Sequence, residues 1–200
     1  MNWKNSFNKK WTVITVITFD TEKNKMEKEL PKRKEIRLKQ YDYSSPGAYF
    51  ITICTENRKN YFWEGAFDPQ LFAWNTVGAN CVRPQNLPLS AVGKIVFDEL
   101  KRWHKTYSSV SLHAYVIMPN HIHIMVAIVA DEYGRPQVAP TLERMVKQFK
   151  GAVTKKIGCS IWQKSFIEHI VRNQNDYETR LNYMYNNPMR WYYDKIYKDE

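Results

Sequence analysis

The sequence predicts an α+β protein built on one antiparallel sheet, with helices packed on one face of that sheet. Apolar residues recur with a period of two in some segments and near 3.6 in others, and the two kinds of segment alternate along the chain. Residues 112–118 and 121–128 are both strand-like and are joined only by Pro119 and Asn120, so they should pair directly. Alternating strands and helices with such direct connections are typical of a ferredoxin-like arrangement. A chain of 200 residues suffices for one domain of this kind.

The start of the chain differs from the rest. Residues 1–31 are interpreted as an N-terminal extension, either a flexible or appended segment or the product of an upstream start, because Met26 would make a natural first residue. The apolar run at 11–19 is too short to span a bilayer, and no small-residue cleavage site follows it. We therefore expect a cytoplasmic protein that has no membrane partner, with its folded domain at 32–195.

The strands are expected in the following places. A turn at 45–47 precedes a β-rich strand at 48–55. The region up to Pro88 should hold one more strand and an irregular insertion around 75–88. After the strand pair described above, the last strand is expected within 160–173.

Three helices are predicted from capping residues and apolar periodicity. Ser90 can cap a helix that runs to about residue 107, and Thr141 starts a second helix. Asn175 and Glu178 form a capping box at the start of the last helix, and Pro188 should end it.

Two histidines stand one residue apart in the strand at 121–128. Alternate residues of a strand share a face, so His121, His123 and Met125 should point one way and the isoleucines between them the other. The two imidazoles are then about 7 Å apart along the strand, a separation that one metal ion can bridge if the side chains converge. Ordinary polar-face histidines would show the same pattern, and a metal would need a further ligand of another type.

The last helix carries a second unusual pair. Its apolar stripe consists of Tyr177, Leu181 and Met184, with Tyr185 at the edge. Tyr183 projects away from this stripe, and Asn187 lies one turn further along on the same side as Tyr183. Arg180 lies close to both. Read alone, this could equally be an ordinary surface tyrosine near a helix end.

Charge favours a polyanionic partner. The chain has 30 Lys and Arg against 20 Asp and Glu, a formal charge of +10, which favours nucleic acid over membrane but does not by itself separate the two. The three cysteines are far apart and form no C-x-x-C pair, so a disulfide framework or zinc knuckle is not expected.

Four segments in order carry a family resemblance: "YDYSSPGAYFITICTENR", "YVIMPNHIHIMV", "IWQKSFIEHIVRN" and "YMYNNPMRW". Together they resemble the IS200-type Y1 transposases of the HUH class, most of all the REP-associated tyrosine transposases, over about residues 32–191. The resemblance implies that His121 and His123 bind a divalent metal, Mg²⁺ or Mn²⁺, and that Asn187 completes the metal site. It implies that Tyr183 is the nucleophile.

The implied activity is that of a metal-dependent single-strand DNA endonuclease and strand transferase. It would form a 5′-phosphotyrosine intermediate on single-stranded or hairpin DNA, as a monomer or a homodimer. The alternative is a catalytically idle hairpin-binding or regulatory module on the same fold. The residues expected to contact DNA are basic: Lys32, Arg33, Lys34, Arg37, Lys39, Lys147, Arg172 and Arg180. A solvated charged tail or helix face is the alternative for most of them.

Overall fold

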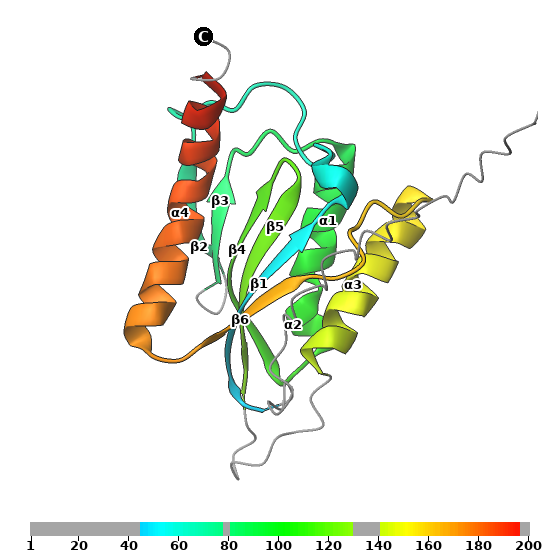
Figure 1. The fold of residues 1–200 in the computed structure, drawn as a ribbon, viewed down its shortest axis with the longest axis vertical. Coiled ribbons are helices and arrows are strands. Elements are labelled where there is room, and N and C mark those ends of the chain that lie inside the picture. Colours follow the sequence, from blue (N-terminus) through cyan, green and yellow to red (C-terminus); the bar gives the residue numbers. More distant parts are fainter. Residues whose placement is uncertain (1–44, 78–80, 130–140, 197–200) are drawn as a thin grey trace, which may run out of the picture. The chain divides into compact units, whose positions relative to one another are not determined.

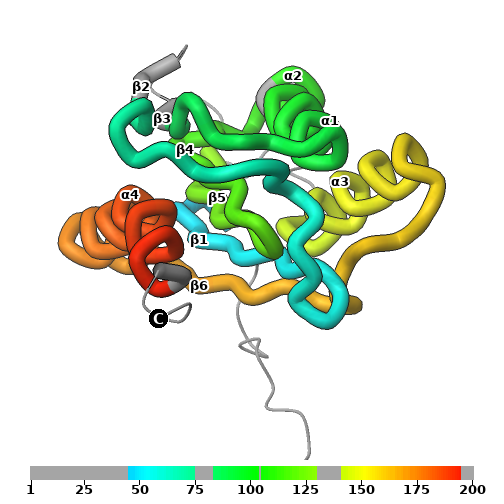
Figure 2. The backbone as a smooth tube through the Cα atoms, turned by 90° about the horizontal axis from the view of Figure 1, so that it is seen from above, coloured from blue at the N-terminus to red at the C-terminus, as the bar shows by residue number. Residues whose placement is uncertain are grey.

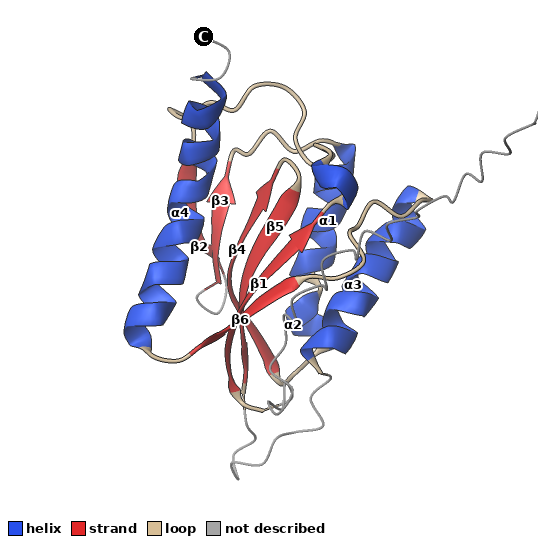
Figure 3. Cartoon of the chain, viewed as in Figure 1, coloured by secondary structure: helices blue, strands red, loops and turns tan. Residues whose placement is uncertain are grey.

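A computed structural model describes residues 45–77, 81–129 and 141–196 of the chain (Figure 1). The strands are β1 (Gly47–Cys54), β2 (Ala73–Val77), β3 (Cys81–Gln85), β4 (Val110–Met118), β5 (His121–Ile128) and β6 (Ile167–Val171). The helices are α1 (Ala91–Lys101), α2 (Trp103–Thr106), α3 (Leu142–Ile157) and α4 (Gln174–Ile196), with a 3-10 turn at Glu56–Arg58 (Figure 3).

The strands form one sheet in the order β2-β3-β4-β5-β1-β6. Its four strands β4-β5-β1-β6 are antiparallel throughout. With the β2–β3 hairpin set aside, they follow the chain as strand, helix, two strands, helix, strand, which is ferredoxin-like connectivity. The predicted α+β class is confirmed, and β5 has the predicted bounds.

Helices cover both faces of the sheet, so the prediction that they pack on one face is wrong. Residues of α1 and α3 such as Val96 and Phe149 join Ile122 and Ile124 in one core cluster. Met184 of α4 joins Met125 in a second cluster on the opposite face. Figure 2 shows the sheet lying between α4 and the other helices. Both faces of β4 and β5 are apolar enough to need a cover, and burying each large aliphatic side chain contributes about 1.5–3 kcal/mol.

The last helix differs from its prediction at both ends. Asn173, and not Asn175, caps it, because the Asn173 Oδ1 accepts a hydrogen bond from the Asp176 N–H at 2.9 Å. Pro188 lies inside α4 and does not end it. The residues beyond Pro188 have packing partners: Trp191 contacts the second core cluster, and the Tyr192 ring lies 5.9 Å from the Phe67 ring. These contacts offset the backbone hydrogen bond that proline cannot donate.

Two internal segments also differ. The expected irregular insertion around 75–88 contains most of a β2–β3 hairpin, which joins the sheet through one parallel bridge between Val82 and Ala114. The helix expected from Ser90 to about residue 107 is interrupted at Arg102, which separates α1 from α2. The caps at Ser90 and Thr141 are confirmed, since each side chain accepts from a backbone N–H in the first turn.

The prediction of an N-terminal extension at 1–31 lies outside the described residues. Among the helices that the structure describes, none is long and apolar enough to cross a membrane.

Candidate active site

The two strand histidines converge on one point. Ile122 and Ile124 point into the core under α1 and α3, so the alternation of β5 turns His121 and His123 toward α4. Both imidazoles are buried, with exposed fractions of 7% and 3%. Their Nε2 atoms lie 3.0 Å apart. Two neutral imidazoles at this distance can share an Nε2–H···Nε2 hydrogen bond, and the same separation is compatible with one cation held by both Nε2 atoms.

The other ring nitrogens are held by neighbouring side chains. The Nδ1 of His121 lies 2.8 Å from Oδ1 of Asn120, and an amide oxygen can only accept, so His121 donates there and keeps a lone pair on Nε2. The Nδ1 of His123 lies 2.8 Å from Oγ1 of Thr52. Thr52 is the register partner of His123 across the β1–β5 pairing. Such partners fix the orientation of metal-ligating imidazoles.

A third candidate ligand comes from α4. The Asn187 side chain is 9% exposed, and its Nδ2 lies 3.4 Å from Nε2 of His123. A half-turn of the amide presents Oδ1 at the same place, and an amide oxygen is a ligand that Mg²⁺ and Mn²⁺ accept. No group of three or more His, Cys, Asp or Glu side chains that could hold a metal occurs in the described ranges. The candidate donor set here consists of two imidazoles and an amide.

Burial keeps both imidazoles neutral. It lowers the pKa of His121 to about 4, with a further contribution from the positive charge of Arg58. The pKa of His123 is also lowered well below its ordinary value, first by burial and then by the charges of His121 and Arg58. Near pH 7 both imidazoles are therefore neutral, and each can present an Nε2 lone pair to a metal when its proton is on Nδ1.

Tyr183 stands beside this donor set. It is one helical turn before Asn187, and its side chain is 42% exposed. Its ring centroid lies 5.2 Å from that of His123 and 6.1 Å from that of Phe50. Phe50 in turn stacks on His123 at 5.2 Å. The most exposed member of this ring group is thus the one that carries a hydroxyl.

Tyr185 lies elsewhere on α4. Its ring centroid is 4.6 Å from that of Trp74, and its backbone carbonyl accepts a hydrogen bond from Trp74 Nε1. Burial raises the pKa of the Tyr185 hydroxyl. Of these two neighbouring tyrosines, it is Tyr183 that has a ring contact with the histidines.

Three of the basic residues expected to contact DNA are described, and they lie in three different places. Arg180 lies near the site: its guanidinium is 5.9 Å from the Phe50 ring, and Asp176 accepts from its Nε at 3.4 Å. Arg172 follows β6 and is exposed. Lys147 is exposed on α3, across the sheet from the histidines. Lys32, Arg33, Lys34, Arg37 and Lys39 lie outside the described residues.

Sequence reasoning missed the residues that hold the histidines in place. Thr52 is a polar residue inside an otherwise apolar strand, and this position could have indicated a side chain that forms a specific hydrogen bond. Asn120 directly precedes His121, so its proximity could also have been inferred. Trp191 also lies beside the site, with its ring 6.1 Å from that of His121.

Comparison with known proteins gives one long match and two shorter ones. An uncharacterised protein of Haemophilus influenzae is 31% identical over 188 residues, which cover 84% of this chain and 94% of that protein. A putative REP-associated tyrosine transposase of the same organism is 27% identical over 116 residues, 51% of this chain and 66% of the relative. The REP-associated tyrosine transposase of Escherichia coli K12 is 32% identical over 79 residues, 40% of this chain and 44% of the relative.

A solved structure has a similar fold. It is the structure of a REP-associated tyrosine transposase bound to a REP hairpin, with a TM-score of 0.53 and 20% identity. The similarity covers 77% of this chain and 73% of that one. No protein-family model matches the chain.

Proposed function

Since the chain is a distant homologue of the REP-associated tyrosine transposases, we propose that it is a metal-dependent endonuclease and strand transferase acting on single-stranded DNA. Its substrates are hairpin-forming repeats, because the structural relative is bound to a REP hairpin. The observation that carries the proposal is the convergence of two neutral imidazoles and an amide beside an exposed tyrosine.

In this proposal, His121, His123 and Asn187 hold Mg²⁺ or Mn²⁺. The ion, when bound, would polarise the scissile phosphate and neutralise charge that develops on its oxygens. Thr52 and Asn120 keep the imidazoles oriented toward the shared point. Phe50 packs against His123 and limits the water around the ligands.

Tyr183 performs the covalent step. Its phenol oxygen forms a bond to phosphorus while the bond to the 3′ oxygen breaks, so the products are a 5′-phosphotyrosine and a free 3′-hydroxyl. The phenol loses its proton to solvent and the leaving oxygen gains one. The phosphodiester energy stays in the covalent link, so another 3′-hydroxyl can reverse the step and join strands without a nucleotide cofactor.

In this proposal a single chain supplies both the metal ligands and the nucleophile. The Tyr183 ring contacts the His123 ring of its own chain. A monomer therefore suffices for the cleavage step, and no second copy has to supply the nucleophile.

Adduct formation tests the proposal directly. The full chain is incubated with Mn²⁺ and labelled single-stranded hairpins, selected from a library with random flanks, and resolved on a denaturing gel. We expect a protein–DNA adduct that disappears in EDTA and in Tyr183→Phe. Tyr185→Phe is the matched control and should keep the adduct.

Two outcomes count against the proposal. An adduct that persists in Tyr183→Phe, or a nucleotide located on Tyr185 by mass spectrometry, would show that a residue other than Tyr183 is the nucleophile. Hairpin binding without any adduct in the wild-type chain would favour the idle DNA-binding module instead.

A further inference from the structure

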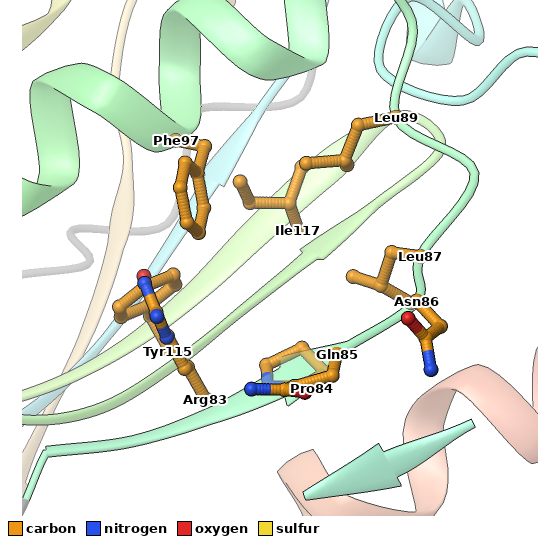
Figure 4. A pocket seen from close by; sticks show the side chains of 9 residues that line it. All are labelled: Arg83, Pro84, Gln85, Asn86, Leu87, Leu89, Phe97, Tyr115 and Ile117. Carbon is orange, nitrogen blue, oxygen red and sulfur yellow. The ribbon is translucent and has the colours of Figure 1, made fainter. Parts of the chain in front are cut away.

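A pocket lies on the face of the sheet opposite the histidines. It has a volume of about 240 Å³ and is enclosed by β3, the segment after β3, α1 and β4. Its apolar wall includes Leu87, Phe97 and Ile117, and its polar side includes Arg83 and Gln85. Figure 4 shows Phe97 and Ile117 above the space in this view, Pro84 and Gln85 below it, and Arg83 beside Tyr115. None of these residues belongs to the site described above.

The pocket and the histidine site share one end of the sheet. Tyr115 and Ile117 point toward α1, whereas Val116 and Met118 between and after them point toward α4. Met118 is the register partner of His121. Because β3 runs parallel to β4, the segment after Gln85 lies at the same end as His121. DNA that crosses this end can contact both faces.

The lining has the chemistry of a nucleotide site. The Phe97 ring offers an apolar surface, and the Arg83 guanidinium carbon lies 5.2 Å from its centroid. Lys101 also lies over this ring at 4.4 Å but is paired with Asp98 at 2.9 Å. Within the described part of the chain, no carboxylate forms an ion pair with Arg83. Arg83 is therefore the cation that remains available for a phosphate.

The size and polarity of the pocket further limit which ligand it can bind. The volume falls below the roughly 300–1,000 Å³ of sites for drug-sized molecules, so the pocket suits one planar ring system. The amide of Gln85, which can both donate and accept, can pair with the edge of a nucleobase. Unstacked bases of single strands and hairpin loops are typically bound by aromatic rings and guanidinium groups in this way.

We propose that this pocket binds one unpaired nucleobase of the substrate DNA, with the adjacent phosphate on Arg83. The proposal rests on the DNA-hairpin function proposed above and adds a second contact on the reverse face of the sheet. The base can come from the hairpin loop or from a single-stranded flank.

An abasic scan of the DNA tests this. Binding of fluorescein-labelled hairpins, selected as above, is measured by anisotropy with the full chain, with one abasic position moved through the loop and both flanks. We expect one position whose loss weakens binding about tenfold, as removal of a stacked base does. In Phe97→Leu the same abasic change should have no further effect, because the stacking partner is already gone. The position of the effect identifies loop or flank as the source.

Salt dependence tests the phosphate contact. Arg83→Gln should reduce the slope of log affinity against log salt by about 0.7, the value for one phosphate contact on single-stranded DNA. Lys94→Gln, an exposed cation of α1 that does not line the pocket, is the matched control and should leave the slope unchanged. Thermal melting of each variant confirms that it is folded.

The outcomes separate this proposal from the function on which it rests. Adduct formation is measured in the same samples. If hairpins bind and form the Tyr183 adduct but no abasic position depends on Phe97, the pocket proposal is wrong and the function stands. If hairpins neither bind nor form an adduct, both fail.

Discussion

Acidification should destabilise the metal-free protein through its buried histidines. In the folded chain the pKa of His121 is about 4, against an ordinary value of 6.5. Between these values the unfolded chain binds a proton that the folded chain does not, so the free energy of unfolding falls as pH falls from 6.5 to 4. At about pH 5 the solution is about 1.5 pH units below the ordinary pKa of 6.5, so the free energy of unfolding is about 2 kcal/mol lower than at neutral pH through His121 alone.

Other titratable groups add to the pH dependence or act outside this pH range. The pKa of His123 is lowered as well, so His123 contributes in the same direction. His113 also has a pKa lowered by burial, so it adds to the pH dependence of the free energy of unfolding. Because His113 is present in both the wild-type chain and the control variant below, its contribution cancels in the comparison. Asp176 has a pKa below its ordinary 3.8, so its contribution to stability is lost only at lower pH than the histidine window.

The assay is urea unfolding followed by tryptophan fluorescence, in EDTA, at about pH 7 and about pH 5. The double variant His121→Gln and His123→Gln is the control, because it keeps hydrogen-bonding side chains but removes both titrations. We expect the wild-type chain to lose at least about 2 kcal/mol more than the control between the two pH values. Equal losses in both proteins would show that the imidazoles are not held neutral by burial.

Three further predictions concern the site and the chain start. Thr52→Val removes the hydrogen bond to His123 and should weaken Mn²⁺ binding about 10–100-fold in calorimetric titration, with cleavage restored by excess metal; unchanged affinity would contradict the orienting role. His121→Ala should abolish adduct formation while hairpin affinity by anisotropy stays largely intact, and cleavage that survives in this variant or in EDTA would rule out the metal site. A chain that starts at Met26 should fold and form the adduct like the full chain, and loss of folding by circular dichroism would show that the first residues belong to the sheet.

Local patterns account for the part of the fold that could be predicted. The alternation in β5 and the Pro119–Asn120 break determine its bounds and the face of each histidine. Ser90 and Thr141 act as caps through hydrogen bonds within the first helical turn, which sequence spacing alone specifies.

Features that depend on distant contacts were not predictable in the same way. The continuation of α4 past Pro188 depends on Trp191 and Tyr192, whose partners are far away in sequence. The β2–β3 hairpin joins the sheet through a parallel bridge to β4, which no local pattern indicates. The local sequence pattern therefore predicted a helix that ends at Pro188, whereas tertiary contacts stabilise its continuation beyond that residue.

In the candidate site, too, local patterns were predictable from the sequence and distant contacts were not. Tyr183 and Asn187 are related by one helical turn, and His121 and His123 by one strand repeat, so each pair could be found in the sequence. The contact between the pairs could not, because it requires α4 to cover the face of the sheet away from α1 and α3. The same non-local choice places Lys147 across the sheet from the histidines.

In the proposed function, the position of α4 also determines how DNA would reach the candidate metal ligands. Asn187 covers the histidines from the helix, and Phe50 stacks on His123 from β1. Trp191 lies beside His121, which leaves both imidazoles almost without exposed surface. Tyr183 keeps 42% of its surface exposed at the rim of this group. In the proposed function, the buried His121 and His123 would hold the metal and the exposed Tyr183 at their rim would meet the scissile phosphate, so burial of the ligands and exposure of the nucleophile favour the same attack geometry.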